Sequence, residues 1–190
     1  MGKVVFDQSM SLDGFTTGPD PRREEPNGDG GMQLVEWALE GGQEDRRLLE
    51  EAVAGLGAAI AGRRTYDLSV PWWGADGPSG PARVPLFVAT HEAPSDSPED
   101  GVYTFVTDGI EAALERAQAV AGDKDVCVMG GASLGRLYLE AGLVDELSIH
   151  LVPVLLGDGT RMFDAQRLPL EVASVVETPA ATHVRYRVLR

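Results

Sequence analysis

The sequence predicts an α/β protein whose central sheet is mostly parallel, with an antiparallel edge near the C-terminus. Short apolar runs that suit buried strands alternate with helical repeats up to residue 156. The last two strand-like runs, 171–177 and 182–189, are separated by a short turn that contains Pro179, as in a hairpin. Strands that alternate with helices form parallel sheets, and a terminal hairpin adds antiparallel strands.

The composition predicts a single domain over residues 1–190. A chain of 190 residues can bury one real core, and 43% of its residues are hydrophobic while 24% are charged. The N-terminal residues lack a signal-peptide core, and no apolar run reaches the roughly 18 residues needed to span a bilayer. We therefore expect a cytoplasmic protein. The one cysteine, Cys127, lies in a predicted buried strand, so neither a disulfide nor a cysteine-rich metal site is expected.

The charge of the chain narrows the choice of partners. Sixteen basic and thirty acidic residues give a net charge of −14, which repels nucleic acid and anionic membranes. We expect a small-molecule substrate, and neither nucleic acid nor membrane as a partner. A phosphate-rich cofactor would need local positive charge, so arginines that adjoin glycines are the first candidates for its site.

The first elements include one long loop. Residues 3–8 predict the first strand, and Asp13 with Gly14 predicts the turn after it. Residues 16–31 contain no aliphatic side chain and predict a surface loop, either a functional lid or a disordered connection. Residues 32–39 predict a short helix, and residues 45–56 an amphipathic one.

The next strand, 58–62, ends at Gly62 and leads directly into a helix that begins with Arg63. Arg64 and Thr65 lie on its first turn, so the segment offers positive charge, a hydroxyl and a helix N-terminus to a phosphate. The alternative is a plain N-cap with two solvated arginines. A loop with Pro71, two tryptophans and Pro78 follows, and the next elements are strands over 85–90 and 100–107 and a helix over 109–121.

A second glycine turn follows the apolar strand 126–129. The chain breaks at Gly130 and Gly131 and restarts at once as a helix that ends near Gly142. Paired glycines allow another molecule to approach the backbone, and the helix N-terminus favours an anion. Ala132 replaces the third glycine of the dinucleotide fingerprint, and the pattern of the triphosphatase phosphate loop is absent. A tight turn without a ligand remains the alternative.

The chain ends with a strand over 145–156 and the two strands of the terminal pair. These last strands are apolar enough to leave a sheet edge that needs covering, which predicts a possible homodimer.

Four segments, in this order and spacing, resemble one known superfamily. They are 10–18 (MSLDGFTTG), 62–66 (GRRTY), 128–134 (VMGGASL) and 151–159 (LVPVLLGDG). Together they resemble the dihydrofolate reductase superfamily, and within it the group related to the C-terminal reductase domain of the bifunctional riboflavin-biosynthesis deaminase-reductase. The resemblance implies a dihydrofolate reductase-like three-layer α/β/α fold over the whole chain.

The resemblance also implies an oxidoreductase that uses NADPH to transfer a hydride to a small planar heterocycle. The heterocycle would be pterin-like or 5-amino-6-(5-phosphoribosylamino)uracil-like. Carried over by position, the cofactor-binding residues are Gly62, Arg63, Arg64 and Thr65 for the phosphates, Thr90 and His91 for the adenosine side, and Gly130, Gly131, Ala132, Ser133 and Leu134 for the pyrophosphate and nicotinamide ribose. The rival hypothesis is a catalytically silent NADP-binding module.

Two carboxylates are candidate catalytic residues. Folate reductases hold the pterin with an acid on the first helix, and the nearest acid here is Glu36, which adjoins Trp37. If it faces an apolar pocket, burial would raise its pKa toward that of a proton donor. Asp13 is the second candidate, although an Asp-Gly turn explains it equally well without catalysis. His150, in a long strand, is interpreted as a structural residue of the sheet.

Overall fold

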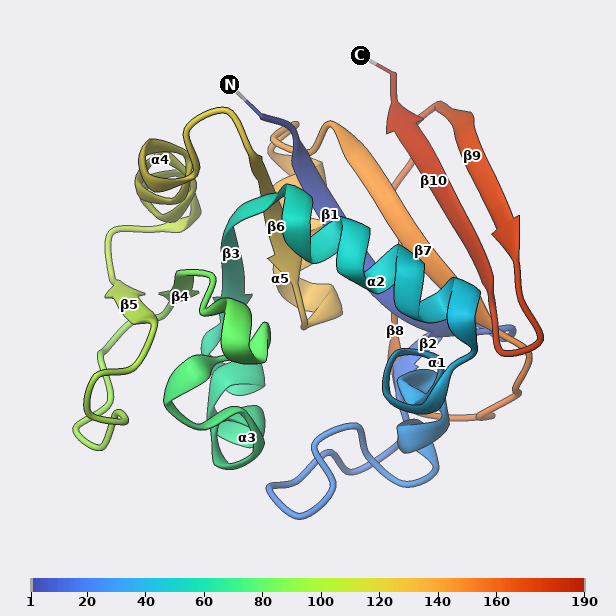
Figure 1. Cartoon of the computed structure of the whole chain (residues 1–190), viewed down its shortest axis with the longest axis horizontal. Coiled ribbons are helices and arrows are strands. Elements are labelled where there is room, and N and C mark those ends of the chain that lie inside the picture. Colours follow the sequence, from blue (N-terminus) through green and yellow to red (C-terminus); the bar gives the residue numbers. More distant parts are fainter. Residues whose placement is uncertain (1, 190) are drawn as a thin grey trace.

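The computed structural model describes residues 2–189, which are built around an eight-stranded sheet (Figure 1). From edge to edge its strands are β5 (Tyr103–Val106), β4 (Leu86–Ala89), β3 (Leu56–Gly62), β6 (Asp125–Met129), β1 (Val4–Ser11), β7 (Glu146–Val152), β10 (Thr182–Val188) and β9 (Leu170–Glu177). The strands from β5 to β7 are parallel, and β10 pairs antiparallel with both β7 and β9. The predicted parallel sheet with an antiparallel C-terminal edge is confirmed.

Helices cover both faces of this sheet. They are η1 (Gly31–Leu34), α1 (Glu36–Glu40), α2 (Gln43–Gly55), α3 (Arg63–Trp73), η2 (Gly74–Asp76), η3 (Gly80–Ala82), α4 (Ile110–Ala121) and α5 (Ala132–Glu140). Figure 1 shows α2 and α3 in front of the sheet and α5 behind it. Together they form the three layers that the sequence resemblance implied. Within residues 2–189, no helix has both the length and the apolar character needed to cross a membrane.

The main core lies between the sheet and the layer of α4 and α5. It contains Phe6 and Ile60 from the sheet and Leu114 and Tyr138 from the two helices, all buried. Gly135 allows α5 to lie directly on Phe6, because a Cβ built at Gly135 would be only 2.0 Å from the phenylalanine Cζ. A second, smaller cluster lies between α3 and strands β3 and β4 on the other face.

The bounds of several predicted elements were wrong. β1 continues beyond residue 8 to Ser11, because its later residues pair with β7. The predicted strand over 145–156 ends at Val152, before the proline at position 153. The predicted helix over 32–39 is divided at Val35 into η1 and α1. Helix α3 passes through Pro71 to Trp73, where the sequence predicted a loop; the ring removes one hydrogen bond, and the helix ends within the next turn.

The segment 16–31 folds back on itself and is not a free surface loop. Its first residues belong to β2 (Phe15–Thr17), which pairs with β8 (Thr160–Arg161), and Thr16 is buried. Arg22 forms an ion pair with Asp29 across the loop. The indole N–H of Trp72, in α3, donates a 3.1 Å hydrogen bond to the carbonyl oxygen of Arg23. This loop therefore reaches from β2 to a contact with α3.

Candidate active site

The two glycine turns predicted from the sequence lie side by side at the carboxyl edge of the sheet. β3 and β6 are neighbouring parallel strands, so the helices that follow them, α3 and α5, begin at the same edge. A Cβ built at Gly62 would lie 3.8 Å from the Cβ of Leu134, at the start of α5. Two helix N-termini, each with free backbone N–H groups and a partial positive charge, therefore face one region.

Thr65 fills the space beside the second turn. Gly130 and Gly131 have φ angles of 66° and 90°, a backbone conformation that favours glycine. A Cβ at Gly130 would come within 2.5 Å of the Thr65 methyl group, and one at Gly131 within 3.0 Å of its hydroxyl oxygen. The turn geometry and the contact with α3 thus explain both glycines without a ligand, which is the alternative that the sequence left open.

The two arginines of α3 differ in their surroundings. Arg63 is held by the Asp67 carboxylate at 2.7 Å and donates to the Glu92 carbonyl oxygen at 2.6 Å. The hydrogen bond that Arg63 donates to the Asp67 carboxylate raises the pKa of Arg63 further, so its charge is fixed. Arg64 is exposed and forms no ion pair within residues 2–189. Arg64 is therefore the cation that is available to an anionic ligand.

Thr90 and His91 lie at the same corner, because β4 pairs with β3 and ends beside Gly62. The Thr90 hydroxyl accepts a long 3.5 Å hydrogen bond from Arg63 and donates to the Glu92 carbonyl oxygen at 2.8 Å. The His91 side chain is exposed. The structure thus brings the two residues proposed for the adenosine side next to the residues proposed for the phosphates.

The first turn of α5 contributes mainly backbone groups. Ala132 and Leu134 are buried in the core, and Ser133 is exposed. The Ser133 hydroxyl lies 3.5 Å from the guanidinium of Arg136, which also donates to the carbonyl oxygen of Arg161. The side chain of Ser133 and the N–H groups of this turn are therefore what α5 offers to a ligand.

Asp13 clamps two distant segments. Its carboxylate accepts hydrogen bonds from the Ser11 hydroxyl at 2.6 Å and from the backbone N–H groups of Leu156 and Gly157 at 3.1 and 2.7 Å. The bond from Ser11 and those from the two N–H groups lower the pKa of Asp13 to about 2. Asp13 is thus an ionised acceptor that holds the 11–15 turn to the segment after β7.

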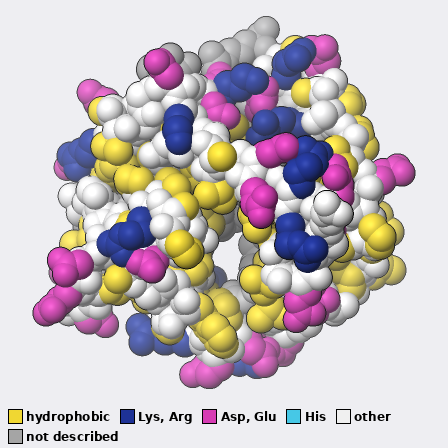
Figure 2. All heavy atoms as spheres, in the orientation of Figure 1, with side chains coloured by type: hydrophobic (Ala, Val, Ile, Leu, Met, Phe, Trp, Pro, Cys, Tyr) yellow, Lys and Arg dark blue, Asp and Glu magenta, His cyan; other side chains and the backbone are white. Residues whose placement is uncertain are grey.

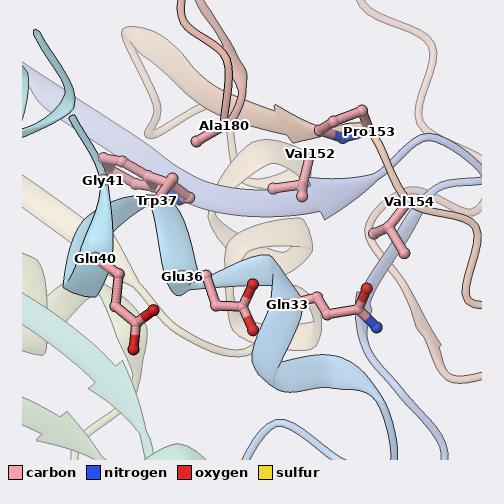
Figure 3. Close-up of a pocket in the computed structure, with 9 residues that line it drawn as sticks. All are labelled: Gln33, Glu36, Trp37, Glu40, Gly41, Val152, Pro153, Val154 and Ala180. Carbon is pink, nitrogen blue, oxygen red and sulfur yellow. The ribbon is translucent and has the colours of Figure 1, made fainter.

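Glu36 lies on the rim of an open pocket of about 340 Å³ (Figure 3). The pocket is lined by residues of η1, α1 and the end of β7: Gln33, Glu36, Trp37, Glu40, Gly41, Val152, Pro153 and Val154, with Ala180. Figure 3 shows Glu36 and Glu40 on the same side of the pocket, below Trp37. Glu36 is exposed, so the expectation that it faces an apolar pocket from a buried position is wrong.

The model of the family described as the RibD C-terminal domain matches residues 2–184, almost the entire chain. The chain belongs to this family. The Bacillus subtilis (strain 168) protein YyaP is 25% identical to this chain over 170 residues, which cover 85% of this chain and 80% of YyaP. The Corynebacterium ammoniagenes riboflavin biosynthesis protein RibD is 28% identical over 160 residues, which cover 82% of this chain and 44% of that protein.

The fold agrees with solved structures of the same family. RibD from Acinetobacter baumannii superposes with a TM-score of 0.68 at 19% identity, over 100% of this chain and 59% of that one. This RibD C-terminal domain therefore spans less than two thirds of either RibD chain that it matches. The dihydrofolate reductase-like fold predicted from the four sequence segments is confirmed.

A buried polar chain in this RibD C-terminal domain was not predicted. It connects strands β1, β7 and β10 to α2, in the order Asp7, His150, His183, Asp45. The distances are 3.2 Å from Asp7 Oδ2 to His150 Nε2, 2.7 Å between the two Nδ1 atoms, and 3.1 Å from His183 Nε2 to Asp45 Oδ1. Sequence analysis noted only His150, as a structural residue. The available signal was in β7, where polar residues occupy every second position, at Glu146, Ser148 and His150.

Trp37 packs against both histidines of this polar chain. Its ring lies 4.1 Å from that of His150 and 4.8 Å from that of His183, and its N–H donates to the Ser9 hydroxyl at 2.9 Å. Because Trp37 also lines the pocket that contains Glu36, the two histidines lie directly behind the pocket wall.

The surface of the RibD C-terminal domain is hollowed beside these residues. Figure 2, in the orientation of Figure 1, shows an opening between the part of the molecule with α3 and the part with α1, with hydrophobic side chains around it. Within residues 2–189 no group of three or more His, Cys, Asp or Glu side chains is arranged to hold a metal ion. The two helix N-termini and Arg64 suit an organic ligand with an anionic end.

Proposed function

We propose that this RibD C-terminal domain is an NADPH-dependent reductase of a small planar heterocycle. The observation that carries the proposal is the pair of adjacent helix N-termini, at Gly62 and Gly131, with the unpaired cation Arg64 on the first turn of one of them. Membership of the RibD C-terminal domain family supports a reductase over a module that only binds the cofactor.

The residues of the two turns fit the anionic part of NADPH. Arg64 is placed to bind the 2′-phosphate, and the N–H groups at the start of α5 are suited to the pyrophosphate, with the Ser133 hydroxyl beside them. Thr90 and His91 would lie on the adenosine side. When bound, the cofactor would supply a hydride to the substrate. The protein's part is to hold the reacting groups in place and to exclude water.

The proposed substrate site is the pocket with Trp37 and Glu36. The face of Trp37 offers an apolar wall to a flat ring, and Glu36 offers a carboxylate acceptor to ring or amino N–H groups. A ring that is pterin-like or 5-amino-6-(5-phosphoribosylamino)uracil-like carries such donors. Glu36 is exposed, so we assign it to binding first and to proton supply second.

The test is the fall in absorbance at 340 nm when NADPH and the protein are mixed with dihydropterin, folate and aminopyrimidine compounds. Oxidation with any of them supports the reductase, and tight NADPH binding without oxidation by any compound supports a binding module. Glu36→Gln should weaken the substrate and leave NADPH affinity unchanged. Glu40→Gln is the matched control, because Glu40 lines the same pocket one helical turn away. Equal activity of the two variants and the wild type would remove Glu36 from the site.

A further inference from the structure

The chain of Asp7, His150, His183 and Asp45 contains three hydrogen-bonding links, and each link needs one proton. Two neutral imidazoles carry one N–H each, which provides only two. If His183 donates to Asp45, its Nδ1 is an acceptor, and His150 must donate from Nδ1. Nε2 of a neutral His150 would then face the Asp7 carboxylate with a lone pair. A third proton is needed to complete the chain.

The surroundings place this third proton on His150. The side chain of Asp45 is 1% exposed and that of His183 is 7% exposed. Burial lowers the pKa of His183, which keeps that ring neutral. Burial acts to raise the pKa of Asp7, but the charge of His150 and its hydrogen bond outweigh burial, so the pKa of Asp7 is lowered. The Trp37 ring is tilted by 32° to the His150 ring, at 4.1 Å between centroids, and is edge-on to His183, at 70°. A cation is stabilised over the face of an indole.

The other charged groups near the chain are two cations and one carboxylate. Arg185, from β10, lies 3.6 Å from Glu146 of β7, which also binds Lys3. Arg185 also contributes to the lowered pKa of Asp7. Cys127, from β6, faces Asp7 as a neutral thiol, because burial raises its pKa well above the usual value. A proton on His150 therefore neutralises one of the two carboxylate charges at the ends of the chain.

Asp7 is the end of this chain that can exchange protons with its surroundings. Its side chain is 34% exposed although it lies on the central strand of the sheet. Its register partner on β6 is Met129, the residue that immediately precedes the Gly130 turn. The buried end at Asp45 has no such access. Asp7 is therefore the most exposed member of the chain, and a proton can leave there, on the side where the glycine turns lie.

We propose that Asp7 is the carboxylate that delivers a proton to the bound substrate, and that His150, His183 and Asp45 are positioning residues that keep one proton beside it. In this step the proton leaves Nε2 of His150 and passes through the Asp7 carboxylate to a basic ring nitrogen of the substrate. The four side chains change from three shared protons to two, and their net charge from −1 to −2. One proton from water, taken up through Asp7, restores the chain. Use of the proton in reduction rests on the function proposed above.

The proton count can be measured without a cofactor. The protein has three histidines, and the third, His91, is exposed and serves as an internal standard. Nitrogen-15 NMR of the whole protein, labelled at histidine, reports the protonation of each ring nitrogen. In a spectrum recorded at pH 8, the three links require protons on both ring nitrogens of His150 and on Nε2 alone of His183. Two neutral buried rings at pH 8 would overturn the proposal.

Asp7→Asn tests whether the Asp7 carboxylate keeps the third proton on His150. In this variant the third proton should be lost, because the asparagine amide can donate to a lone pair on Nε2 of His150, whereas a carboxylate can only accept. The His91 signals should not change. An unaltered His150 spectrum in a folded Asp7→Asn protein would contradict the proposal, and the wild-type spectrum decides the proton count if this variant fails to fold.

Turnover separates this proposal from the function on which it rests. In the NADPH oxidation assay, Asp7→Asn should lower kcat by about 10²- to 10⁴-fold, the range for a lost proton donor, and leave the Kd of NADPH unchanged. If the protein gives the expected NMR spectrum but oxidises NADPH with none of the compounds, the reductase function is contradicted and the proton chain is not. A protein that oxidises NADPH with both buried rings neutral at pH 8 contradicts the proton chain alone.

Discussion

The carboxylate of Asp13 accepts the backbone N–H of Gly157 at 2.7 Å, across 144 positions of the chain. This bond holds the turn after β1 to the segment after β7, and it depends on the negative charge of Asp13. The pKa of Asp13 is lowered to about 2 in the folded protein, against about 3.9 in an unfolded chain. The stabilisation by Asp13 is therefore complete above about pH 4 and is lost as the pH falls toward 2.

Asp13→Asn should accordingly destabilise the protein at pH 6 and have a smaller effect near pH 3. Urea unfolding at the two pH values measures the difference from the wild type. Asp20→Asn is the control, since Asp20 is an exposed residue whose nearest cation, Arg22, is 3.6 Å away. A loss of stability at Asp13→Asn that does not change with pH would show that the charge is not what the clamp requires.

Arg64 should determine the preference for NADPH over NADH. A charge-assisted hydrogen bond to the 2′-phosphate contributes about 1.5 to 3 kcal/mol, or roughly 10- to 150-fold in affinity. Arg64→Ala should remove this preference, which in the wild type should shrink with added salt. Arg63→Ala should keep most of it, because Arg63 is already paired with Asp67.

Calorimetry with both cofactors on the wild type and both variants measures these affinities. If Arg64→Ala retains the wild-type preference, the 2′-phosphate is bound elsewhere, and His91 and Arg136 are the next residues to change.

The contact between Thr65 and the glycine turn predicts a coupling between two substitutions. Gly130→Ala should destabilise the protein by about 1 to 3 kcal/mol, because Gly130 has a positive φ and the new Cβ would meet the Thr65 methyl group. Thr65→Ser removes that methyl group, so Gly130→Ala should cost less in the Thr65→Ser protein. Urea unfolding of the four proteins gives the coupling energy.

Gly131→Ala provides the contrast. Its Cβ would meet the hydroxyl oxygen of Thr65, which Thr65→Ser retains. The cost of Gly131→Ala should therefore be the same in both backgrounds. Equal costs for Gly130→Ala in both backgrounds as well would show that backbone strain alone, and not Thr65, requires a glycine at position 130.

Strand β9 is predicted to form a homodimer contact. It is the edge strand of the sheet, and Val172 and Val175 are 58% and 52% exposed. Light scattering at micromolar concentration should give twice the chain mass of 20.2 kDa. Val172→Lys should shift the mass toward the monomer, whereas Leu155→Lys, at an exposed residue outside β9, should not. A wild-type mass of one chain would disprove the contact.

The sequence was sufficient for the features that depend on neighbouring residues. Apolar runs located every strand of the main sheet, and the glycines at 62 and 130–131 located the two turns at its carboxyl edge. Both signals are local: a run of apolar side chains predicts burial, and a glycine between a strand and a helix predicts a turn. Family resemblance then ordered these elements correctly.

The sequence was not sufficient where the partners are far apart along the chain. Asp7 and His150 are separated by 143 positions, and His183 and Asp45 by 138, so no local pattern joins them. The pairing of β2 with β8 was missed for the same reason. Arg63 and Arg64 are adjacent in sequence, yet only the position of Asp67, one helical turn later, shows which of them is available.

The central position of β1 has a consequence for biosynthesis. Its neighbours in the sheet, β6 and β7, lie more than a hundred residues later, as the separation of 122 between Lys3 and Asp125 shows. A ribosome that adds about 5 to 20 residues per second takes roughly 6 to 24 s to make that stretch. Throughout this time the apolar strand Val4–Ser11 has no neighbour to pair with. Slow folding and early binding by a chaperone are therefore properties of this strand order.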